Sequence, residues 1–247
     1  MSNQMSANPF EFGFVAALER EVSGVVRGWS VTSARIENAE RRIYYNYDQR
    51  AALICAGTGV DRAYTAAKAL IEKCSPRVII SIGFAGSCAP HLHPGSVVVP
   101  ATLSEAATGK TFGCAFGSGR LVTLDRVAGR ALKQEASARF GAMAVDMEAA
   151  GVAIAAAECG RGVVAIKAIS DGAEEDLEFL SGFVKPEGFE SGRFIAHIAL
   201  RPGLWPSVAA LNRNSKLAVT ALASAVGECM KDWRSFSAKH RDAAAQV

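Results

Sequence analysis

The chain has 247 residues, of which 50% are hydrophobic and 21% charged, and its formal net charge is only +3. This composition is typical of a globular protein with a sizeable core. The basic residues are scattered, so the chain lacks the basic patch of nucleic-acid-binding proteins, and we expect no nucleic-acid partner. Apolar runs such as Val78–Ile82 and Val97–Val99 are far shorter than the roughly 20 residues that span a bilayer, which predicts no transmembrane segment.

The organisation expected from the sequence is a single domain, because no linker interrupts the chain. Residues 1–10 are polar and are expected to form a flexible N-terminal segment. Because this segment lacks an apolar signal core, we expect the protein to lie in the cytoplasm. Residues 11–230 are then the domain and 231–247 a polar C-terminal tail. Six cysteines without CxxC spacing or nearby histidines predict reduced, mostly buried thiols and no metal site: Cys55, Cys74, Cys88, Cys114, Cys159 and Cys229.

The first half of the chain is predicted to contain several strands and one helix. The apolar run Phe12–Leu18 predicts a buried strand. Alternating Ile43, Tyr45 and Tyr47, and then Ala51–Cys55, predict two further strands with an edge character. Small and apolar residues recur at helical spacing over Asp61–Lys73, with Asp61 placed to cap the helix. The β-branched run Val78–Ile82 is typical of a fully buried parallel strand.

The second half repeats this alternation. The predicted elements are a helix near 126–140, a strand near 142–145, a helix at 147–159 and a strand at 163–169. Alternating strands and helices predict an α/β protein: a single three-layer domain with a central mixed, largely parallel sheet flanked by helices.

Chemically interesting residues follow three of the predicted strands. They are Gly83–Gly86, Asp146–Glu148 and Ser170–Asp171. Ligands of such sheets bind at the carboxyl ends of the strands, so we expect these residues to meet in one site.

Four segments resemble the purine nucleoside phosphorylase and methylthioadenosine nucleosidase superfamily, over roughly residues 12–172. The segments are Ala17–Val22, Ser81–Gly86, Ala144–Ala149 and Ala168–Asp171. Each is weak alone, but four in the same order and spacing are specific. The resemblance implies the nucleoside phosphorylase-like fold, an enzyme that cleaves a purine N-ribosyl bond, a small-molecule purine nucleoside as substrate, and a homodimer or higher homo-oligomer.

The resemblance gives Asp171 and Ser170 the central role. Asp171 would hold or deliver a proton to the purine N7, with Ser170 hydrogen-bonded beside it to fix its orientation. The residues alone equally allow a helix cap after a buried strand, because Ser and Asp are favoured capping residues.

The ribose would be bound by the segment that resembles the family's sugar motif. Glu148 would accept hydrogen bonds from the ribose hydroxyls and Met147 would pack against the sugar face. The alternatives are a carboxylate that stabilises a helix N-terminus and a methionine that fills the core. Asp146 stands where the nucleosidases often have Glu, and its role is left open.

Glu21 matches the carboxylate that positions or activates water in hydrolytic members. The alternative is a solvated Glu on a short surface helix, since Glu19 and Arg20 beside it are charged.

The base-site loop, with Phe84, Ala85 and Gly86 as substrate-binding residues, departs from the family at Phe84. Many relatives have a small or hydroxylated residue there, and phosphorylases of the hexameric type place Arg and Ser nearby to bind phosphate. This loop is therefore poor for phosphate. No cofactor is expected, but inorganic phosphate stays open as a co-substrate, since charge or backbone donors remain at a few positions: Arg20, Arg62, Lys167 and Gly57–Gly59.

The C-terminal segments 201–206 and 211–215 resemble the hopanoid-associated branch of the superfamily, whose members are thought to remove adenine from adenosylhopane. A lipid-linked purine nucleoside would imply transient contact with the inner membrane surface. Apolar residues near these segments would line a channel for the lipid, or would simply pack a long connection onto the core: Phe179, Leu180, Phe183, Val184, Phe189, Leu200, Leu204, Trp205 and Pro206.

Four alternative functions are compared with the same residues. A methylthioadenosine or S-adenosylhomocysteine nucleosidase and a phosphate-dependent purine nucleoside phosphorylase share the resemblance. A nucleoside-binding protein without chemistry would not need Glu21, Glu148 and Asp171 together. A dinucleotide-dependent oxidoreductase would need a GxGxxG turn, and Gly57–Arg62 lacks the third glycine.

Overall fold

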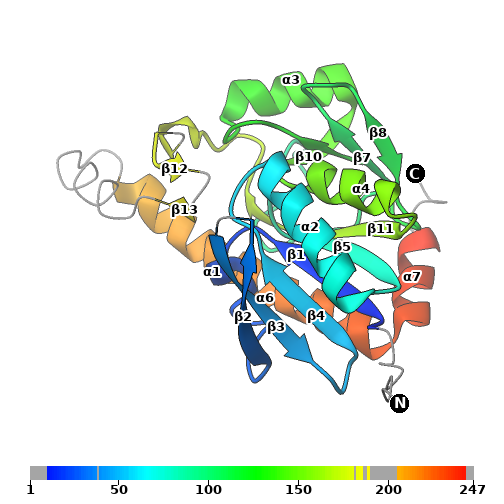
Figure 1. Ribbon diagram of the computed structural model, residues 1–247. Helices are drawn as coiled ribbons and strands as arrows, with labels where there is room; N and C mark the ends of the chain where they lie inside the picture. Colours follow the sequence, from blue (N-terminus) through cyan, green and yellow to red (C-terminus); the bar gives the residue numbers. More distant parts are fainter. Residues whose placement is uncertain (1–9, 38, 181, 186–187, 190–204, 243–247) are drawn as a thin grey trace, which may run out of the picture.

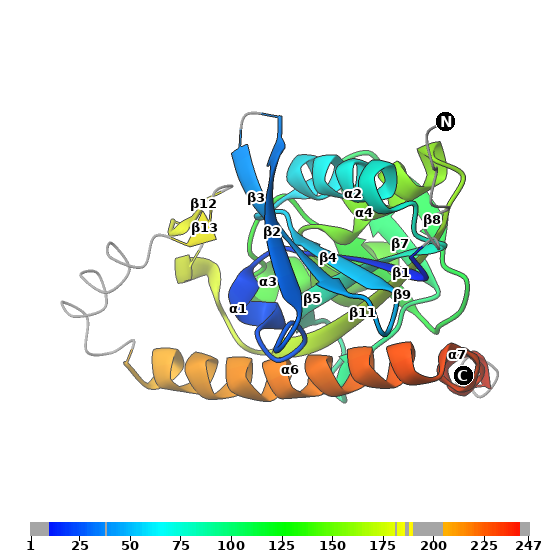
Figure 2. The same cartoon turned by 60° about the horizontal axis from the view of Figure 1, so that its bottom comes forward.

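The computed structural model describes residues 10–37, 39–180, 182–185, 188–189 and 205–242. Within these residues a mixed sheet of eleven strands lies between two layers of helices (Figures 1 and 2). Helices α2 (Val60–Cys74) and α4 (Ala149–Glu158) cover one face, and the long helix α6 (Trp205–Lys231) runs along the other. The predicted three-layer α/β fold is confirmed.

The sheet has the strand order β2-β3-β4-β1-β5-β10-β9-β7-β8, with β11 beside β5 and β6 beside β11. Its strands are β1 (Phe12–Ala16), β2 (Ser30–Ile36), β3 (Ala39–Asn46), β4 (Ala51–Cys55), β5 (Val78–Ser87), β6 (Val97–Val98), β7 (Thr102–Glu105), β8 (Thr111–Gly113), β9 (Arg120–Thr123), β10 (Ala142–Asp146) and β11 (Gly162–Asp171). The other elements are α1 (Glu19–Val22), α3 (Arg130–Phe140), a 3-10 turn (Glu178–Leu180), α7 (Trp233–Asp242) and a hairpin of β12 (Val184–Lys185) and β13 (Gly188–Phe189).

The centre of the sheet is parallel and covered on both faces. Strands β4, β1, β5 and β11 run parallel, and every residue of β1 and β4 is buried. Successive side chains point to opposite faces, so Val15 packs into the cluster under α2 and α4 while Phe14 packs into the cluster under α6. Burial on both faces explains why these strands read as continuous apolar runs.

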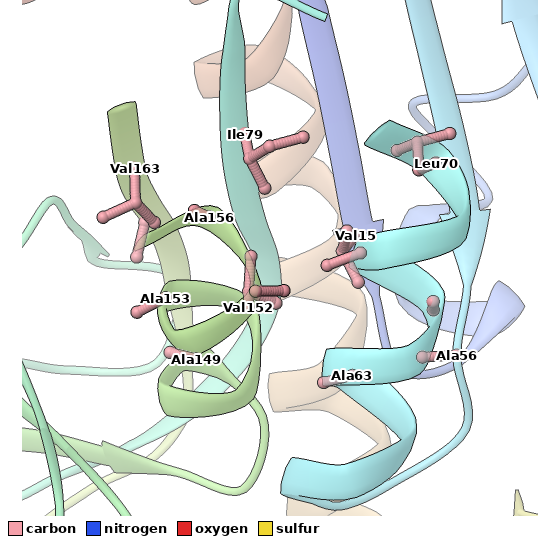
Figure 3. Packing of buried hydrophobic residues seen from close by; sticks show 14 of the residues in the cluster. Val15, Ala56, Ala63, Leu70, Ile79, Ala149, Val152, Ala153, Ala156 and Val163 are labelled. Atoms are coloured by element: carbon pink, nitrogen blue, oxygen red, sulfur yellow. The ribbon is translucent and has the colours of Figure 1, made fainter. Parts of the chain in front are cut away.

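Helices α2 and α4 pack side by side through small residues (Figure 3). Ala63 of α2 and Ala149 and Ala153 of α4 are fully buried there. The closest approach is at Gly151, where an added Cβ would lie 2.1 Å from the carbonyl oxygen of Val60. Only a residue without a side chain fits between the two backbones.

Several predicted elements differ at their ends. β5 continues to Ser87, so the glycine-rich segment expected to be a loop lies within a strand, because β11 and β10 pair with it through Ala85↔Ile169 and Gly86↔Val145. Asp61 lies in the first turn of α2 and does not cap it through its side chain. The α3 and α4 helices begin at residues 130 and 149, a few residues later than predicted.

The C-terminal part of the chain differs most from the prediction. Helix α7 occupies most of the segment that was expected to be a polar tail, and its Phe236 is 3% exposed. The Trp233 ring lies 5.6 Å from that of Phe12 and 5.1 Å from that of Phe116. The domain therefore extends to Asp242. None of the described helices has the length and apolar character needed to cross a membrane, and all six cysteines are free thiols.

The α2–α4 contact gives a stability prediction. Gly151→Ala should lower the free energy of unfolding by about 1–3 kcal/mol, because the new methyl group forces two backbones apart. Gly227→Ala is the matched control: it lies inside α6, an added Cβ meets nothing within 4 Å, and it should stabilise the protein by about 0.5–1 kcal/mol through helix propensity. Urea unfolding of both variants measures the difference. A neutral Gly151→Ala would contradict the close approach.

Candidate active site

A cavity of about 1170 Å³ opens where the carboxyl ends of β1, β5, β10 and β11 meet, and α6 forms its outer wall. This volume exceeds the range of about 300–1,000 Å³ that is usual for small-molecule sites. The cavity brings together all of the residues that the sequence predicted for the site: Glu21, Phe84, Ala85, Gly86, Met147, Glu148, Ser170 and Asp171.

Glu21 is buried at the cavity wall, with 8% of its surface exposed, so the solvated-surface interpretation is wrong. It lies on α1 directly after β1, and its Oε2 is 2.8 Å from the place where a Cβ on Gly83 would be. Burial raises the pKa of the Glu21 carboxyl, against the lowering effect of the nearby Lys167 ammonium. A carboxylate with raised proton affinity is suited to accept a proton from water.

Asp146 holds the start of α4. Its Oδ2 accepts a hydrogen bond from the Ala149 backbone N–H at 2.9 Å, and its Oδ1 accepts one from Thr123 Oγ1 at 2.7 Å. Its Oδ2 is also 2.9 Å from Nζ of Lys167, which is 1% exposed. The role left open by the sequence is thus an anchor for the helix and a partner for a buried lysine.

Glu148 directly follows and points into the same site. Its Oε1 accepts a hydrogen bond from the Gly59 N–H at 3.0 Å. The backbone donor that the sequence offered for phosphate in the Gly57–Gly59 turn thus binds a carboxyl group of the protein. Burial, and then the negative charge of Asp146, raise the pKa of Glu148 to about 8, while Lys167 lowers it. Met147 is half-buried and borders the cavity beside Glu148.

Asp171 ends β11, and both of its oxygens are engaged. Ser170 Oγ donates to Oδ1 at 2.6 Å, and Nζ of Lys133 lies 2.5 Å from Oδ2. The helix-cap interpretation is wrong, because the next helical residues are the 3-10 turn at Glu178. Sequence reasoning missed Lys133, which lies on the buried face of α3 together with Ala136.

The cations that the sequence offered for phosphate are placed differently. Arg20 lines the cavity, Lys167 is paired with Asp146, and Arg62 does not line the cavity. Arg126 and Lys216 also reach its wall. Phe84 is half-buried and packs against the cluster under α6, so a phenyl ring occupies this part of the wall.

The wall along α6 combines apolar side chains with the polar Asn212, Ser215, Lys216 and Thr220. Of the apolar residues proposed for a channel, Leu180 and Trp205 line the cavity, whereas Phe183 is buried outside it. Pro206 is exposed at the start of α6. The side chains or whole residues at the remaining positions lie outside the described residues: Phe179, Val184, Phe189, Leu200 and Leu204. Further apolar lining comes from Leu177, Val208, Leu211 and Val219.

Comparison with solved structures gives the same fold. The chain is similar to the 5′-methylthioadenosine/S-adenosylhomocysteine nucleosidase of Neisseria meningitidis in complex with methylthio-immucillin-A, with a TM-score of 0.68, 19% identity, and 90% and 99% of the two chains covered. It is also similar to the 5′-methylthioadenosine nucleosidase of Arabidopsis thaliana, with a TM-score of 0.69, 18% identity, and 91% and 96% of the two chains covered. A third similar structure is the futalosine hydrolase of Helicobacter pylori, with a TM-score of 0.64, 15% identity, and 88% and 97% of the two chains covered.

No curated protein matches the sequence. The phosphorylase superfamily, in contrast, matches residues 7–138 and 108–187. These residues make up most of the chain and include every residue that was predicted for the site. The chain belongs to the phosphorylase superfamily, a family of enzymes.

Proposed function

We propose that this enzyme hydrolyses the N-glycosidic bond of a purine nucleoside and releases adenine from a 5′-substituted adenosine. The observation that carries the proposal is the convergence of three buried carboxyl groups, from three separate segments, on one cavity. They are Glu21, Glu148 and Asp171.

Cleavage of a purine N-ribosyl bond needs a better leaving group and stabilisation of an oxocarbenium-like sugar. Asp171 serves the leaving group: it gives a proton to N7 as the electrons of the glycosidic bond move to N9. Ser170 fixes the carboxyl group by donating to its other oxygen at 2.6 Å. Phe84, Ala85 and Gly86 form the wall beside the base.

Glu148 serves the sugar. A carboxylate accepts two hydrogen bonds from a vicinal diol well, and Met147 beside it packs against the ribose. The Gly59 N–H at 3.0 Å holds the carboxyl group in place. Hydrogen bonds donated by the diol favour the ionised form of Glu148.

Glu21 positions the nucleophile, and its negative charge favours binding of water over binding of phosphate. An inorganic phosphate needs donors and cations, whereas Glu21 presents a carboxylate beside Gly83 and Lys167 is committed to Asp146. A water molecule held by Glu21 loses its proton to the carboxylate as it attacks C1′. No cofactor takes part in this scheme.

The substrate within this class is adenosylhopane, and the protein acts on it as a homo-oligomer in transient contact with the inner membrane surface. Two observations support this part of the proposal. The C-terminal sequence resembles the hopanoid-associated branch, and the cavity continues past the carboxyl groups along an apolar wall of α6 that includes Val208 and Leu211. Burial of hydrocarbon there contributes about 0.8 kcal/mol for each CH₂ group.

Asp171→Asn should reduce release of adenine by about 10²-fold or more while the protein remains folded, because an amide cannot supply the proton to N7. Steady-state kinetics with a chromatographic assay for adenine measures the loss. Asp125→Asn, an exposed aspartate that does not line the cavity, is the control and should keep full activity. Near-normal turnover by Asp171→Asn would show that the assigned role is wrong.

Glu148→Gln should impair ribosides far more than a 2′,3′-dideoxy analogue, because the lost interaction is with the diol. The comparison is between kcat/KM values for the two substrates in both proteins. Glu135→Gln, on the exposed side of α3, should change neither value. Equal impairment of both substrates would indicate that Glu148 only holds the turn before α2, through the Gly59 N–H.

Adenosylhopane in detergent micelles should be cleaved with a much higher kcat/KM than methylthioadenosine, and the sugar product should be free ribosylhopane with or without phosphate. Mass spectrometry of the products distinguishes this from a ribosyl 1-phosphate. Leu211→Asn in the apolar wall should raise KM for the lipid alone, whereas Leu217→Asn, 50% exposed on the same helix, should not. Efficient cleavage of methylthioadenosine alone would leave a general adenine nucleosidase.

A further inference from the structure

Behind Asp171 lies a buried lysine that no part of the proposed reaction uses. Lys133, on the second turn of α3, is 1% exposed. Its stem passes beside the base wall, since an added Cβ on Gly86 would lie 3.1 Å from its Cε and 2.9 Å from Asp171 Oδ2. A charged side chain is seldom buried unless it is paired, so this placement requires a compensating contact.

All three N–H donors of the Lys133 ammonium are used. One meets Asp171 Oδ2 at 2.5 Å, and the others meet the carbonyl oxygens of Gly172 at 2.8 Å and Glu175 at 3.0 Å. An ammonium group has three donors and no acceptor, so this set leaves none for a substrate. Lys133 thus fixes both the carboxyl group of Asp171 and the chain that follows it.

The charge of Lys133 acts on the chemistry as well as on the geometry. Asp171 is 5% exposed, and a negative charge buried to this extent is costly unless a cation compensates it. The carboxylate is the form that Asp171 takes once its proton has moved to N7. A cation at this position therefore stabilises the state reached at bond cleavage and leaves the binding of the sugar unchanged.

We propose that Lys133 is the positioning residue for Asp171, which holds its carboxyl group toward the purine N7 and stabilises the negative charge left there by proton transfer. The proposal rests on the proposed function. In the step itself Asp171 loses a proton to N7, the C1′–N9 bond breaks with both electrons on N9, and the proton of the attacking water goes to Glu21. Lys133 keeps all of its protons, and Asp171 regains one from solvent after adenine leaves.

The test compares two leaving groups. Lys133→Met should lower kcat for the adenine nucleoside by about 10–100-fold with little change in KM, the scale found when partners behind a functional group are removed. Hydrolysis of 4-nitrophenyl β-riboside, whose leaving group needs no protonation, should change by less than about 3-fold because the step that Lys133 supports is absent. Lys133→Arg, which keeps the charge, should recover part of the nucleoside activity.

Arg130→Met is the matched control. Arg130 lies one turn earlier on α3 and donates to the carbonyl oxygen of Glu174 at 2.9 Å, so it holds the same loop without touching Asp171. It should leave both substrates unchanged. Equal loss of both activities in Lys133→Met, or no loss of either, would overturn the proposal in favour of a structural lysine.

A double mutant covers the case in which Lys133→Met does not fold because it leaves a buried carboxylate unpaired. Asp171→Asn with Lys133→Met removes both charges, and it should be no slower on the nucleoside than Asp171→Asn alone if Lys133 acts through Asp171. A further loss of about 10-fold or more would overturn the proposal. Normal turnover by Asp171→Asn would contradict the proposed function itself, whereas normal turnover by Lys133→Met beside an inactive Asp171→Asn contradicts only this inference.

Discussion

Carboxyl groups that are gathered out of water require a compensating charge, and Lys167 supplies it for the sugar side of this cavity. It lies on β11 with 1% of its side chain exposed, 2.9 Å from Asp146. Burial lowers the pKa of the Lys167 ammonium, but the charges of Asp146, Glu148 and Glu21 raise it more, so the net shift is upward. Removing one partner of such a pair would leave a buried charge unpaired, at a cost of about 3–5 kcal/mol.

The position of the Glu148 carboxyl group depends on that ion pair. Asp146, fixed by Lys167, caps the first turn of α4, which sets where Glu148 begins the helix. The same helix then packs against α2 through Gly151, and the turn before α2 returns the Gly59 N–H to Glu148. The close packing of α2 against α4 thus also sets the orientation of the Glu148 carboxyl group.

Strand β5 explains why glycine occurs twice in the segment from Gly83 to Gly86. An added Cβ at Gly83 would meet Glu21 Oε2 at 2.8 Å, and one at Gly86 would meet Asp171 Oδ2 at 2.9 Å. Gly83 also has a φ of +144°, a conformation that other residues rarely adopt. Each glycine makes room for one carboxyl group, so the backbone of β5 lies against both Glu21 and Asp171.

The sequence predicted the convergence of these groups because each follows or lies on a strand whose apolar run is readable. Parallel strands end at one edge, which applies to β1 and β11 beside β5. The strand before Glu148, β10, instead pairs antiparallel with the last residues of β5. It did not predict that 83–86 stays in the sheet, since pairing with β10 and β11 is a long-range property. Helix α7 was missed because only two of its ten residues, Trp233 and Phe236, are large and apolar. Lys133 was missed because a lysine on a helix is usually solvated, and only the tertiary fold shows that it meets Asp171.

The two ends of the cavity divide the work of binding and catalysis. Buried, charged and hydrogen-bonded groups occupy the end at Glu21, Glu148 and Asp171, whereas the wall along α6 offers apolar side chains that make no polar contact with a reacting atom. Contacts of that second kind are equal in the ground state and the transition state, so they lower KM without changing the barrier. Differential stabilisation can come only from groups that meet charge as it develops, which are the three carboxyl groups and the lysines paired beside them. On the proposed function, a change in the α6 wall therefore alters which substrate is bound, and a change at Lys133 alters how fast a bound substrate reacts.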